Sequence, residues 1–470
     1  MKVLLISPPQ LNMLPTNVPS IVDEETGCYP PLGLTYIAAC VEKYTDHQIE
    51  ILDTHVERMN YEQINNEIRK RNPDIVGIQT MTFTLIDVLL TARIVKGLDK
   101  NIPVILGGPH VNIYPEETIS NPEIDFLVLG EGEYVFCDLI NALFQKKDLS
   151  KIKGIVYKRN GEIINTGKRE FITNLDSLPF PARHLVPYQK YYSVLAKRTP
   201  ITTMMTSRGC PFKCIFCDRP QLGKIFRYRS SESVVDEMEE CARMGIKEVF
   251  LYDDTFSINK KRVIDICEEI LRRNLRIIWN IRARVDTIDE KILKKLKLAG
   301  CERIHYGVEA GTQEVMNTLR KGITLSQAEN AIRWSKEAGI TTLAYFMIGN
   351  PKESREQIEE TIKFAAKLKP DYVHIAITTP FPATELYRNG LERKILSHDY
   401  WKEFAESPGL DFVPEVWEEN LTRKELIGLL KSAYMKFYMR PGYILKRIRS
   451  VKSWPEFRRK AKAGLKLFKI

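Results

Sequence analysis

Three cysteines, Cys210, Cys214 and Cys217, stand on one short segment of the chain with the spacing C-x3-C-x2-C. The segment follows an apolar, β-branched run at 201–206, and a glycine and a proline break that run on either side of Cys210. We therefore expect the thiols at the C-terminal end of a strand, where parallel α/β folds place their chemistry. Thiols at this density can bind a metal or a metal cluster, or form disulfides.

Three kinds of site have to be compared. A structural zinc site needs four ligands, usually as two C-x2-4-C pairs, and the next cysteine, Cys241, falls in a segment with helical periodicity. A disulfide is disfavoured because nine cysteines without a signal-peptide pattern suggest a reducing compartment. An iron–sulfur cube normally takes four thiolates, so three thiolates would leave one iron open to another ligand.

With Phe216 directly before the third cysteine, the loop resembles the cluster motif of the radical S-adenosylmethionine (SAM) superfamily. The resemblance implies a [4Fe–4S] cluster whose open iron binds the amino and carboxylate groups of SAM. It also implies that an electron from the cluster cleaves SAM to a 5′-deoxyadenosyl radical.

The elements that must position this loop are strands that alternate with helices from residue 201 onward. After the first strand we expect strands at 248–253, 277–284, 303–309, 341–348 and 372–378, with helices near 231–244, 260–273, 288–299, 324–338 and 354–368. Six parallel β/α units of this size predict a partial barrel with its active edge at the C-terminal ends of the strands.

Polar residues and a glycine stand at the ends of four of these strands: Asp253 and Asp254, Arg284, Glu309 and Gly349. The resemblance implies that the two aspartates receive the SAM ammonium group and that Arg284 balances its carboxylate. It further implies that Glu309 hydrogen-bonds the ribose hydroxyls and that Gly349 lies beside the adenine.

Residues 1–150 also alternate strands and helices, with strands expected at 3–7, 49–53, 75–80, 104–106 and 126–129. Near-continuous apolar strands separated by helices predict a doubly wound parallel sheet, that is, a Rossmann-like domain. No G-x-G-x-x-G follows the first strand, so dinucleotide binding is disfavoured.

Two segments of this domain resemble the cobalamin-binding domain that precedes many radical SAM domains. Thr80 and Thr82 follow the third strand, and Gly107 and Gly108 follow the fourth. The resemblance implies that these four residues contact cobalamin as a third cofactor. The D-x-H-x-x-G motif that supplies a cobalt-ligating histidine is absent after the first strand, and His55 is only a partial look-alike after the second. We expect cobalamin to bind without a protein histidine, and a domain that has lost cobalamin is the alternative.

The chain is therefore expected to have four regions. They are a Rossmann-like cobalamin-binding domain at 1–150, a linker with a hairpin at 151–195, a partial (β/α)6 radical SAM barrel at 196–385, and a helical C-terminal region at 386–470 with a basic tail. Asn160-Gly161 supplies the hairpin turn.

The net charge of +10 resides in the tail, because Arg440 to Ile470 hold eleven Lys or Arg and one acid. A neutral body does not favour a nucleic-acid partner. The tail mixes its cations with aromatic and aliphatic residues, a composition suited to an anionic membrane surface, and a basic helix packed on the barrel is the alternative. No apolar run approaches the roughly 20 residues of a membrane helix, so we expect a cytoplasmic protein, with the tail on the inner face of the membrane.

We expect a cobalamin-dependent radical SAM enzyme that methylates an unactivated carbon of a small-molecule or lipid substrate, with ferredoxin or flavodoxin as electron donor. One alternative is an oxidative cyclase or ring-rearranging radical SAM enzyme on a lipid or tetrapyrrole-like substrate. Another is a non-catalytic cobalamin or iron–sulfur sensor, which would have no need of the residues expected to contact SAM. The sequence assigns no catalytic residue beyond the cofactor contacts.

Overall fold

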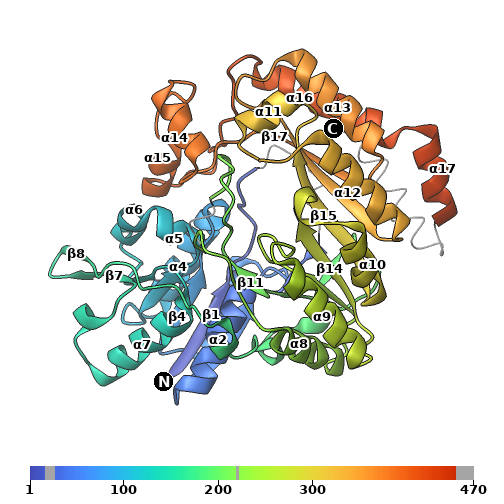
Figure 1. The fold of residues 1–470 in the computed structure, drawn as a ribbon. Helices are drawn as coiled ribbons and strands as arrows, with labels where there is room; N and C mark the ends of the chain where they lie inside the picture. The colour runs from blue at the N-terminus through green and yellow to red at the C-terminus, as the bar shows by residue number, and fades with distance from the viewer. Residues whose placement is uncertain (16–26, 219–221, 451–470) are drawn as a thin grey trace.

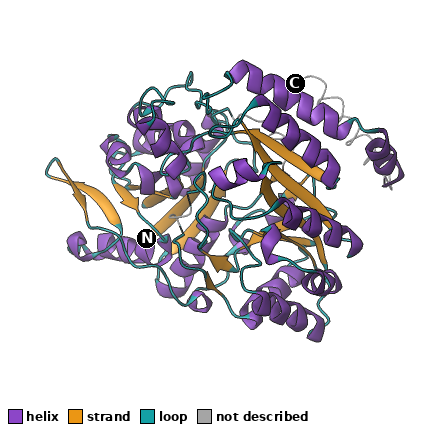
Figure 2. Ribbon diagram, turned by 45° about the horizontal axis from the view of Figure 1, so that its top comes forward, coloured by secondary structure: helices purple, strands orange, loops and turns teal. Residues whose placement is uncertain are grey.

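The computed structural model of the 470-residue chain describes residues 1–15, 27–218 and 222–450, with side chains placed up to residue 445. Two sheets flanked by helices make up the body of the molecule (Figures 1 and 2). The predicted fold class, a Rossmann-like domain followed by a partial barrel, is confirmed.

The first sheet has the strand order β3-β1-β4-β5-β6-β7-β8, and its first five members are parallel. These are β1 (Lys2–Ser7), β3 (Gln48–Asp53), β4 (Ile75–Gln79), β5 (Val104–Gly107) and β6 (Phe126–Val128). The helices between and after them are α2 (Leu32–Tyr44), α3 (Tyr61–Arg71), α4 (Leu85–Leu98), α5 (Pro109–Ile113), α6 (Pro115–Ser120) and α7 (Gly132–Gln145). Separate apolar clusters fill the two faces of the sheet, as expected for strands buried on both sides.

The hairpin expected in the linker belongs to this sheet instead. Strand β7 (Ile155–Arg159) pairs antiparallel with β6, and β8 (Glu162–Asn165) pairs with β7 across the turn at Asn160. Ile155, Val156 and Tyr157 are buried in the domain core, which explains why the hairpin docks there. The boundaries of the four regions stay predictions.

The second sheet has six parallel strands in sequence order, β10-β13-β14-β15-β16-β17. They are β10 (Ile201–Met204), β13 (Glu248–Leu251), β14 (Ile278–Ala283), β15 (Cys301–Glu309), β16 (Thr341–Ile348) and β17 (Tyr372–Ile377). The helices of this region are α8 (Ser231–Arg243), α9 (Lys260–Arg272), α10 (Glu290–Leu298), α11 (Gln313–Thr318), α12 (Leu325–Glu337) and α13 (Arg355–Leu368). Capping boxes at Thr324 and Ser354 begin α12 and α13 where the sequence turns from loop to amphipathic pattern.

The helical C-terminal region divides between the two domains. Helix α16 (Arg423–Tyr438) packs on α13 and β17 of the barrel, and the Tyr434 hydroxyl bonds the Ile375 backbone. Helices α14 (Glu385–Glu392) and α15 (Tyr400–Glu406) instead place Trp401 and its neighbours in the core of the first domain, against α6. This region therefore bridges the two domains (Figure 1).

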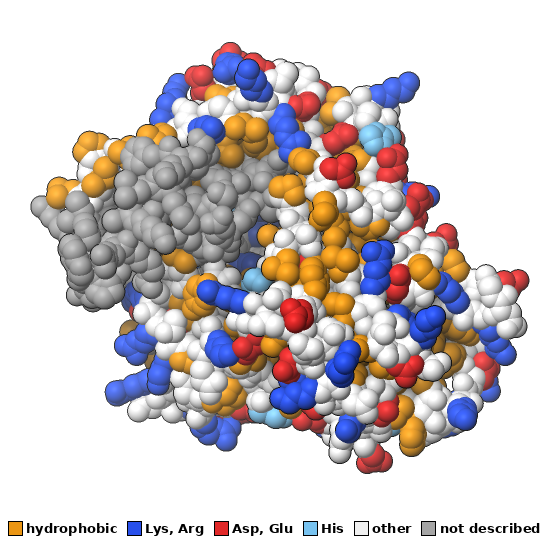
Figure 3. All heavy atoms as spheres, turned by 180° about the vertical axis from the view of Figure 1, so that it is seen from behind, with side chains coloured by type: hydrophobic (Ala, Val, Ile, Leu, Met, Phe, Trp, Pro, Cys, Tyr) orange, Lys and Arg blue, Asp and Glu red, His pale blue; other side chains and the backbone are white. Residues whose placement is uncertain are grey.

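The last described element is α17 (Pro441–Ser450), and most of the basic tail lies outside the described residues, so its expected role is not tested. Within the described part of the chain, no helix is both long and apolar enough to cross a membrane. On the coloured part of the surface in Figure 3, cationic and acidic side chains are interspersed.

Candidate active site

The three cysteines lie on the loop of a short hairpin at the C-terminal end of β10. The stem of this hairpin is β11 (Ser207–Arg208) paired with β12 (Arg227–Tyr228). Gly209 follows the stem with φ of +84°, and a Cβ at this position would lie 2.2 Å from the Ile225 carbonyl oxygen. Only glycine permits this approach, so Gly209 fixes where the cysteine loop leaves the strand.

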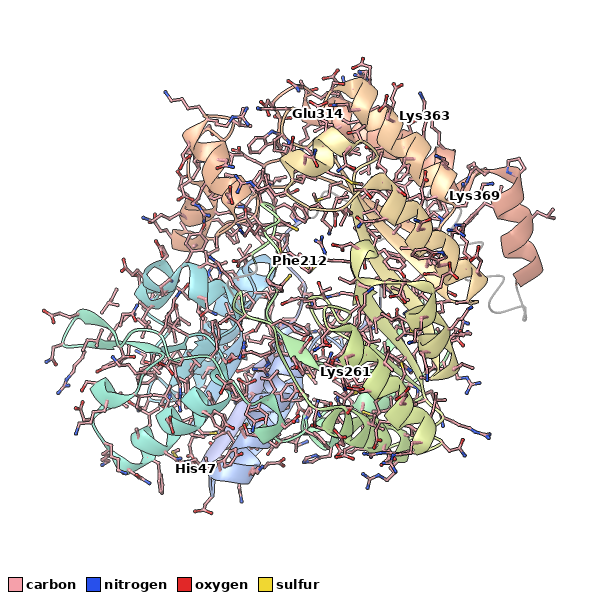
Figure 4. All side chains as sticks on the ribbon, in the orientation of Figure 1. His47, Phe212, Lys261, Glu314, Lys363 and Lys369 are labelled. Carbon is pink, nitrogen blue, oxygen red and sulfur yellow. The ribbon has the colours of Figure 1, made fainter. Side chains whose placement is uncertain are left out.

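The middle of the loop is attached to the barrel. Ile215 is buried, its N–H donates to the Leu319 carbonyl at 3.2 Å, and its carbonyl accepts from the Leu386 N–H at 2.8 Å. Phe216 packs against the barrel core. Figure 4 shows Phe212 of the same loop in the middle of the molecule, between the two domains.

Cys210 and Cys214 are partly buried, whereas Cys217 is exposed. Desolvation by the surrounding protein and the charges of the other two cysteines and Asp254 raise the pKa of the Cys217 thiol to about 12. Among the described residues, no three His, Cys, Asp or Glu side chains converge closely enough to hold a single metal ion. A cube takes each thiolate on a different iron, so a short loop carrying three thiols fits a cluster, and cluster binding would displace the thiol protons.

The two aspartates at the end of β13 have different surroundings. Asp253 is fully buried and accepts hydrogen bonds from the Thr206 N–H at 2.6 Å and from the Thr206 and Ser207 hydroxyls. It therefore holds the turn that leads into the cysteine loop. The Asp254 side chain is exposed, and desolvation by the surrounding protein, with the charge of Asp253, raises its pKa. This geometry favours Asp254 over Asp253 for contact with a ligand.

Arg284, at the end of β14, lies beside the cysteine loop. Its guanidinium stacks on the Phe212 ring, with Cζ 3.7 Å from the ring centroid, and Nη1 lies 3.9 Å from Cys214 Sγ. Asp286 takes two of its N–H groups, at 2.9 and 3.0 Å. The predicted contact with the SAM carboxylate would thus be made by a guanidinium that Asp286 already orients.

Glu309 occupies a strained position at the end of β15. Its φ is +73°, and the register between β15 and β16 shifts between Gly307 and Glu309. Such a bulge redirects a side chain, and left-handed backbone at a residue other than glycine is characteristic of functional sites. Glu309 Oε1 accepts a 2.7 Å hydrogen bond from Lys321. A Cβ on Gly307 would lie 2.4 Å from the same oxygen, so the glycine leaves room for this ion pair.

Gly349 forms the turn after β16, with φ of +75°, and a Cβ there would lie 2.9 Å from Leu426 of α16. Glu353 closes this turn by accepting hydrogen bonds from the Asn350 N–H at 2.9 Å and from the Asn350 amide at 3.0 Å. Burial raises the pKa of Glu353 from its ordinary value of 4.5 to about 7. Glu353 therefore shapes the segment that is expected to lie beside the adenine.

In the first domain, the two expected cobalamin segments touch each other. The Thr80 N–H donates to the Gly107 carbonyl at 2.7 Å, and a Cβ on Gly108 would lie 2.6 Å from the Thr80 carbonyl oxygen. Gly108 has φ of +126°, so both its conformation and its surroundings require glycine. Around Gly107 a Cβ would meet nothing closer than 3.8 Å. This open backbone fits the close approach of a cobalamin nucleotide tail.

The two histidines near this edge differ in position. His55 follows β3, whereas the Thr80 loop follows β4. Because β1 lies between β3 and β4 in the sheet, His55 is separated from the Thr80 loop by one strand. His110, which the sequence interpretation did not assign, is fully buried, and its Nδ1 lies 3.1 Å from the Thr82 hydroxyl. Burial lowers the pKa of His110 to about 4, which keeps its imidazole neutral. The position of His110 shortly after the Gly107-Gly108 pair was the sequence signal that could have identified it as a residue of this edge.

A buried ion-pair network joins the two domains next to the cysteine loop. Glu131 and Glu133 follow β6 of the first sheet, and Arg208 and Arg227 form the hairpin stem. Arg208 pairs with Glu131 at 2.8 Å and with Glu133 at 2.5 Å, and Arg227 pairs with Glu131 at 2.9 Å. The sequence gives these glutamates no identifiable role, because nothing local to them points to partners about 75 to 100 residues away.

Comparison with known proteins identifies the class of protein that this site and fold define. The profile of the radical SAM superfamily matches residues 204–365, and that of the B12 binding domain matches residues 20–140. The first match contains the cysteine loop and the ends of β10, β13, β14, β15 and β16, and the second contains the Thr80 and Gly107 segments.

The sequence is similar over nearly its whole length to curated proteins. It is 38% identical to an uncharacterised methyltransferase of Pyrococcus horikoshii, over 95% of each chain. It is 31% identical to the anaerobic magnesium-protoporphyrin IX monomethyl ester cyclase of Rubrivivax gelatinosus, over 90% of this chain and 76% of the cyclase. The chain therefore belongs to the radical SAM enzymes that carry a B12-binding domain. The predicted family, the enzyme assignment and the three cofactors, [4Fe–4S] cluster, SAM and cobalamin, are confirmed.

Solved structures share the fold. The cobalamin-dependent SAM radical enzyme OxsB with aqua-cobalamin and SAM bound superposes with a TM-score of 0.76 at 19% identity, over 99% of this chain and 72% of OxsB. The radical SAM methyltransferase TsrM from Kitasatospora setae, with cobalamin and a [4Fe–4S] cluster bound, gives a TM-score of 0.67 at 20% identity, over 83% of this chain and 75% of TsrM.

Proposed function

We propose that the protein methylates an unactivated carbon of a small-molecule substrate. The observation that carries this proposal is the match of 38% identity to a protein named as a methyltransferase, over 95% of both chains. A match of this extent includes the cysteine loop, the B12-binding domain and the C-terminal helices together. When bound, the cluster, SAM and cobalamin supply the one-electron chemistry and the methyl group.

The protein's own residues bind, orient and enclose these groups. Cys210, Cys214 and Cys217 would hold the cluster, and Arg284, 3.9 Å from Cys214 Sγ, would place positive charge beside it. Asp254 and the Glu309–Lys321 pair stand at the neighbouring strand ends, and would hydrogen-bond the polar groups of SAM. This distribution of charge supports the predicted order of SAM contacts along the edge of the barrel.

In the first domain, Thr80, Thr82, Gly107 and Gly108 would receive cobalamin. The two threonines are buried, so backbone atoms and the exposed Met81 are the parts of their loop that a ligand can reach. The absence of a D-x-H-x-x-G after β1, and the position of His55 beyond β1, support cobalamin without a histidine ligand.

Product analysis tests methyl transfer. Anaerobically reconstituted enzyme would be incubated with SAM, reductant and cell extract, and 5′-deoxyadenosine and S-adenosylhomocysteine would be quantified. Methyl transfer predicts both products in parallel, with neither formed by the variant in which Cys210, Cys214 and Cys217 are alanine. Deoxyadenosine without S-adenosylhomocysteine would contradict methylation.

That second outcome would favour the alternative, an oxidative cyclase or ring-rearranging enzyme on a lipid or tetrapyrrole-like substrate. The 31% identity to the Rubrivivax cyclase supports this candidate. A non-catalytic sensor would form neither product in any extract, and the assignment to an enzyme family argues against it.

We also propose two partners. A ferredoxin or flavodoxin would deliver electrons to the cluster, which replacement of chemical reductant by either protein would test. The basic tail would bind an anionic membrane surface, because each cation near such a surface contributes about 1 kcal/mol. Sedimentation with anionic and neutral vesicles tests this: only anionic vesicles should retain the protein, and truncation after Met439 should abolish retention. Equal recovery in the supernatant with both vesicle types would refute the membrane proposal.

A further inference from the structure

The interior of the barrel contains a cavity of about 400 Å³. Side chains of four successive strands line it, including Arg282 from β14, Glu309 from β15, Tyr345 and Met347 from β16, and His374 and Ala376 from β17. Its volume is within the range of small-molecule sites, about 300 to 1,000 Å³. The cavity therefore suits a substrate, or part of one, of modest size.

Polar groups lie at the N-terminal side of this cavity, and they bond to one another. Glu248 accepts from the Asn280 amide at 2.7 Å and lies 3.6 Å from Arg303. Arg303 Nε in turn contacts His305 Nε2 at 2.9 Å, and His305 Nδ1 lies 2.8 Å from the Tyr345 hydroxyl. These contacts connect the polar side chains beneath the cavity to one another.

Arg282 differs from the other arginines of this region. Arg284 pairs with Asp286, and Arg303 lies against Glu248. Across the described residues, by contrast, no carboxylate lies within 4.0 Å of the Arg282 guanidinium, which stacks on Tyr252 with Cζ 4.1 Å from the ring centroid. A guanidinium held among aromatic rings without an acid carries an uncompensated charge in a partly desolvated site.

The other ionisable groups that line the cavity do not offset this charge. Glu309 is paired with Lys321, so that pair is neutral as a whole. Burial lowers the pKa of His374 to about 4, and burial with the nearby arginines lowers the pKa of His305 well below 6.5, so both imidazoles are neutral. Asp254 is close enough for Arg282 to lower its pKa, but it forms no ion pair with it. The groups that line the cavity, together with Lys321, therefore carry one net positive charge, on Arg282.

We propose that this cavity is the substrate site and that it takes an anionic substrate, whose carboxylate or phosphate group binds the Arg282 guanidinium. This inference rests on the proposed function and adds the chemical class of the substrate. A planar guanidinium binds either oxyanion with two parallel hydrogen bonds, and such a ligand would supply the missing acid. The imidazole of His374 and the hydroxyl of Tyr345 stand on neighbouring strands, where they can hydrogen-bond without adding charge.

The position of Arg282 on its strand gives the orientation of the substrate. Two residues of a strand span about 6.6 Å, and Arg284, two positions further on, contacts the cysteine loop. An anionic group bound at Arg282 would therefore place carbons a few bonds away at the reactive edge of the barrel. Met347 and Ala376 offer that part of the substrate an apolar wall.

Anion binding can be measured without knowing the substrate. The probes are trifluoroacetate, which stands for a carboxylate, and monofluorophosphate, which stands for a phosphate. Each probe is titrated into the reconstituted holoenzyme, with SAM present and without reductant, and its binding is measured by ¹⁹F NMR. Chloride at about 0.15 M screens weak surface binding, including binding to the basic tail. The comparison is between wild type, Arg282→Gln, Arg282→Lys and Arg169→Gln, the last of which removes an equal charge from an exposed pair with Asp138.

We expect saturable binding of at least one probe to wild type, weakened about tenfold or more in Arg282→Gln and less in Arg282→Lys. The Arg169→Gln control should match wild type, and the probe that binds more tightly identifies the oxyanion class. Equal affinity in wild type and Arg282→Gln, or no saturable binding to wild type, would overturn the proposal. A parallel loss of SAM affinity in Arg282→Gln would also overturn it, because Arg282 would then belong to the SAM site. None of these outcomes depends on turnover, so they are separate from the product analysis that tests methylation.

Discussion

Arg208 Nη1 donates a 2.8 Å hydrogen bond to Glu131 Oε1, and this contact connects the stem of the cysteine hairpin to the B12-binding domain. Both side chains are nearly inaccessible to solvent, at 5% and 3% exposed. Hydrogen bonds from Arg227 and Arg208 and the charge of Arg208 lower the pKa of Glu131 in spite of its burial. The relative position of the cluster loop and the cobalamin domain is thus determined by buried charges and not only by apolar packing.

Glu131→Ala would leave Arg208 and Arg227 with one acid, Glu133, between them. Removing one partner of a buried ion pair costs about 3 to 5 kcal/mol, because the remaining charge stays desolvated. We therefore expect the free energy of unfolding to fall by that amount in chemical denaturation. The matched control is Asp138→Ala, which breaks the exposed pair with Arg169 and should cost at most about 1 kcal/mol. Equal losses in both variants would refute the importance of the buried network.

Asp253 and Asp254 are adjacent in sequence, but we expect their substitution by alanine to impair different properties of the protein. Asp253→Ala removes the acceptor of three hydrogen bonds from Thr206 and Ser207, so the cysteine loop loses its anchor and iron incorporation should fall sharply. Asp254→Ala should retain iron and weaken SAM binding. Iron analysis and SAM titration of the two reconstituted variants check this. The reverse pattern would show that we have exchanged their roles.

Gly108→Val should abolish cobalamin binding. The new side chain would require an unfavourable φ of +126° and would place Cβ 2.6 Å from the Thr80 carbonyl oxygen, which would push apart the two segments expected to receive cobalamin. Gly97→Ala is the control, because a Cβ there meets nothing within 4 Å. Binding is measured by the visible spectrum of co-purified cobalamin after gel filtration. His55→Ala should leave that spectrum unchanged, and a shift of its cobalt bands would identify His55 as a ligand.

Glu353 should make stability depend on pH. Its folded-state pKa of about 7 lies above its ordinary value of 4.5, so between these values the folded protein binds more protons than the unfolded chain. The contribution of Glu353 to the free energy of unfolding is therefore fully present below pH 4.5. It is lost as the pH rises through 7, by at most about 3 kcal/mol. Glu353→Gln, which keeps an acceptor for Asn350, should gain on wild type as the pH rises from 5 to 8. Parallel pH profiles of unfolding for the two proteins would contradict this.

The strands and the cysteine loop could be predicted because their signals are local. Strands such as β1 and β13 are short apolar runs between helical patterns, and the C-x3-C-x2-C spacing occurs within eight residues. The contacts that complete the site are long-range and have no such local signal. Lys321 reaches Glu309 from the segment after α11, and Arg282 is distinguished from Arg284 only by what surrounds it.

The placement of the β7–β8 hairpin and of α14 and α15 could not be predicted for a related reason. Their patterns show that they have an apolar face, but not which domain covers it. Trp401 follows the barrel in sequence but is buried in the apolar cluster of the first domain, where its ring packs against Phe83 as well as against aromatic residues of its own region. Asp253 and Asp254 show that the sequence also does not predict which of two identical side chains at one strand end is buried and which is exposed.

The central claim is that Cys210, Cys214 and Cys217 bind one cluster with an iron that SAM can reach, and electron paramagnetic resonance of the reduced, anaerobically reconstituted protein tests it. Wild type should show a cluster signal that changes when SAM is added, with about four irons per chain. The variant with these three cysteines changed to alanine should lose the iron and the signal. The matched variant with the buried Cys241, Cys267 and Cys301 changed to alanine should keep both. A cluster signal in the first variant, or a wild-type signal that SAM leaves unchanged, would contradict the account.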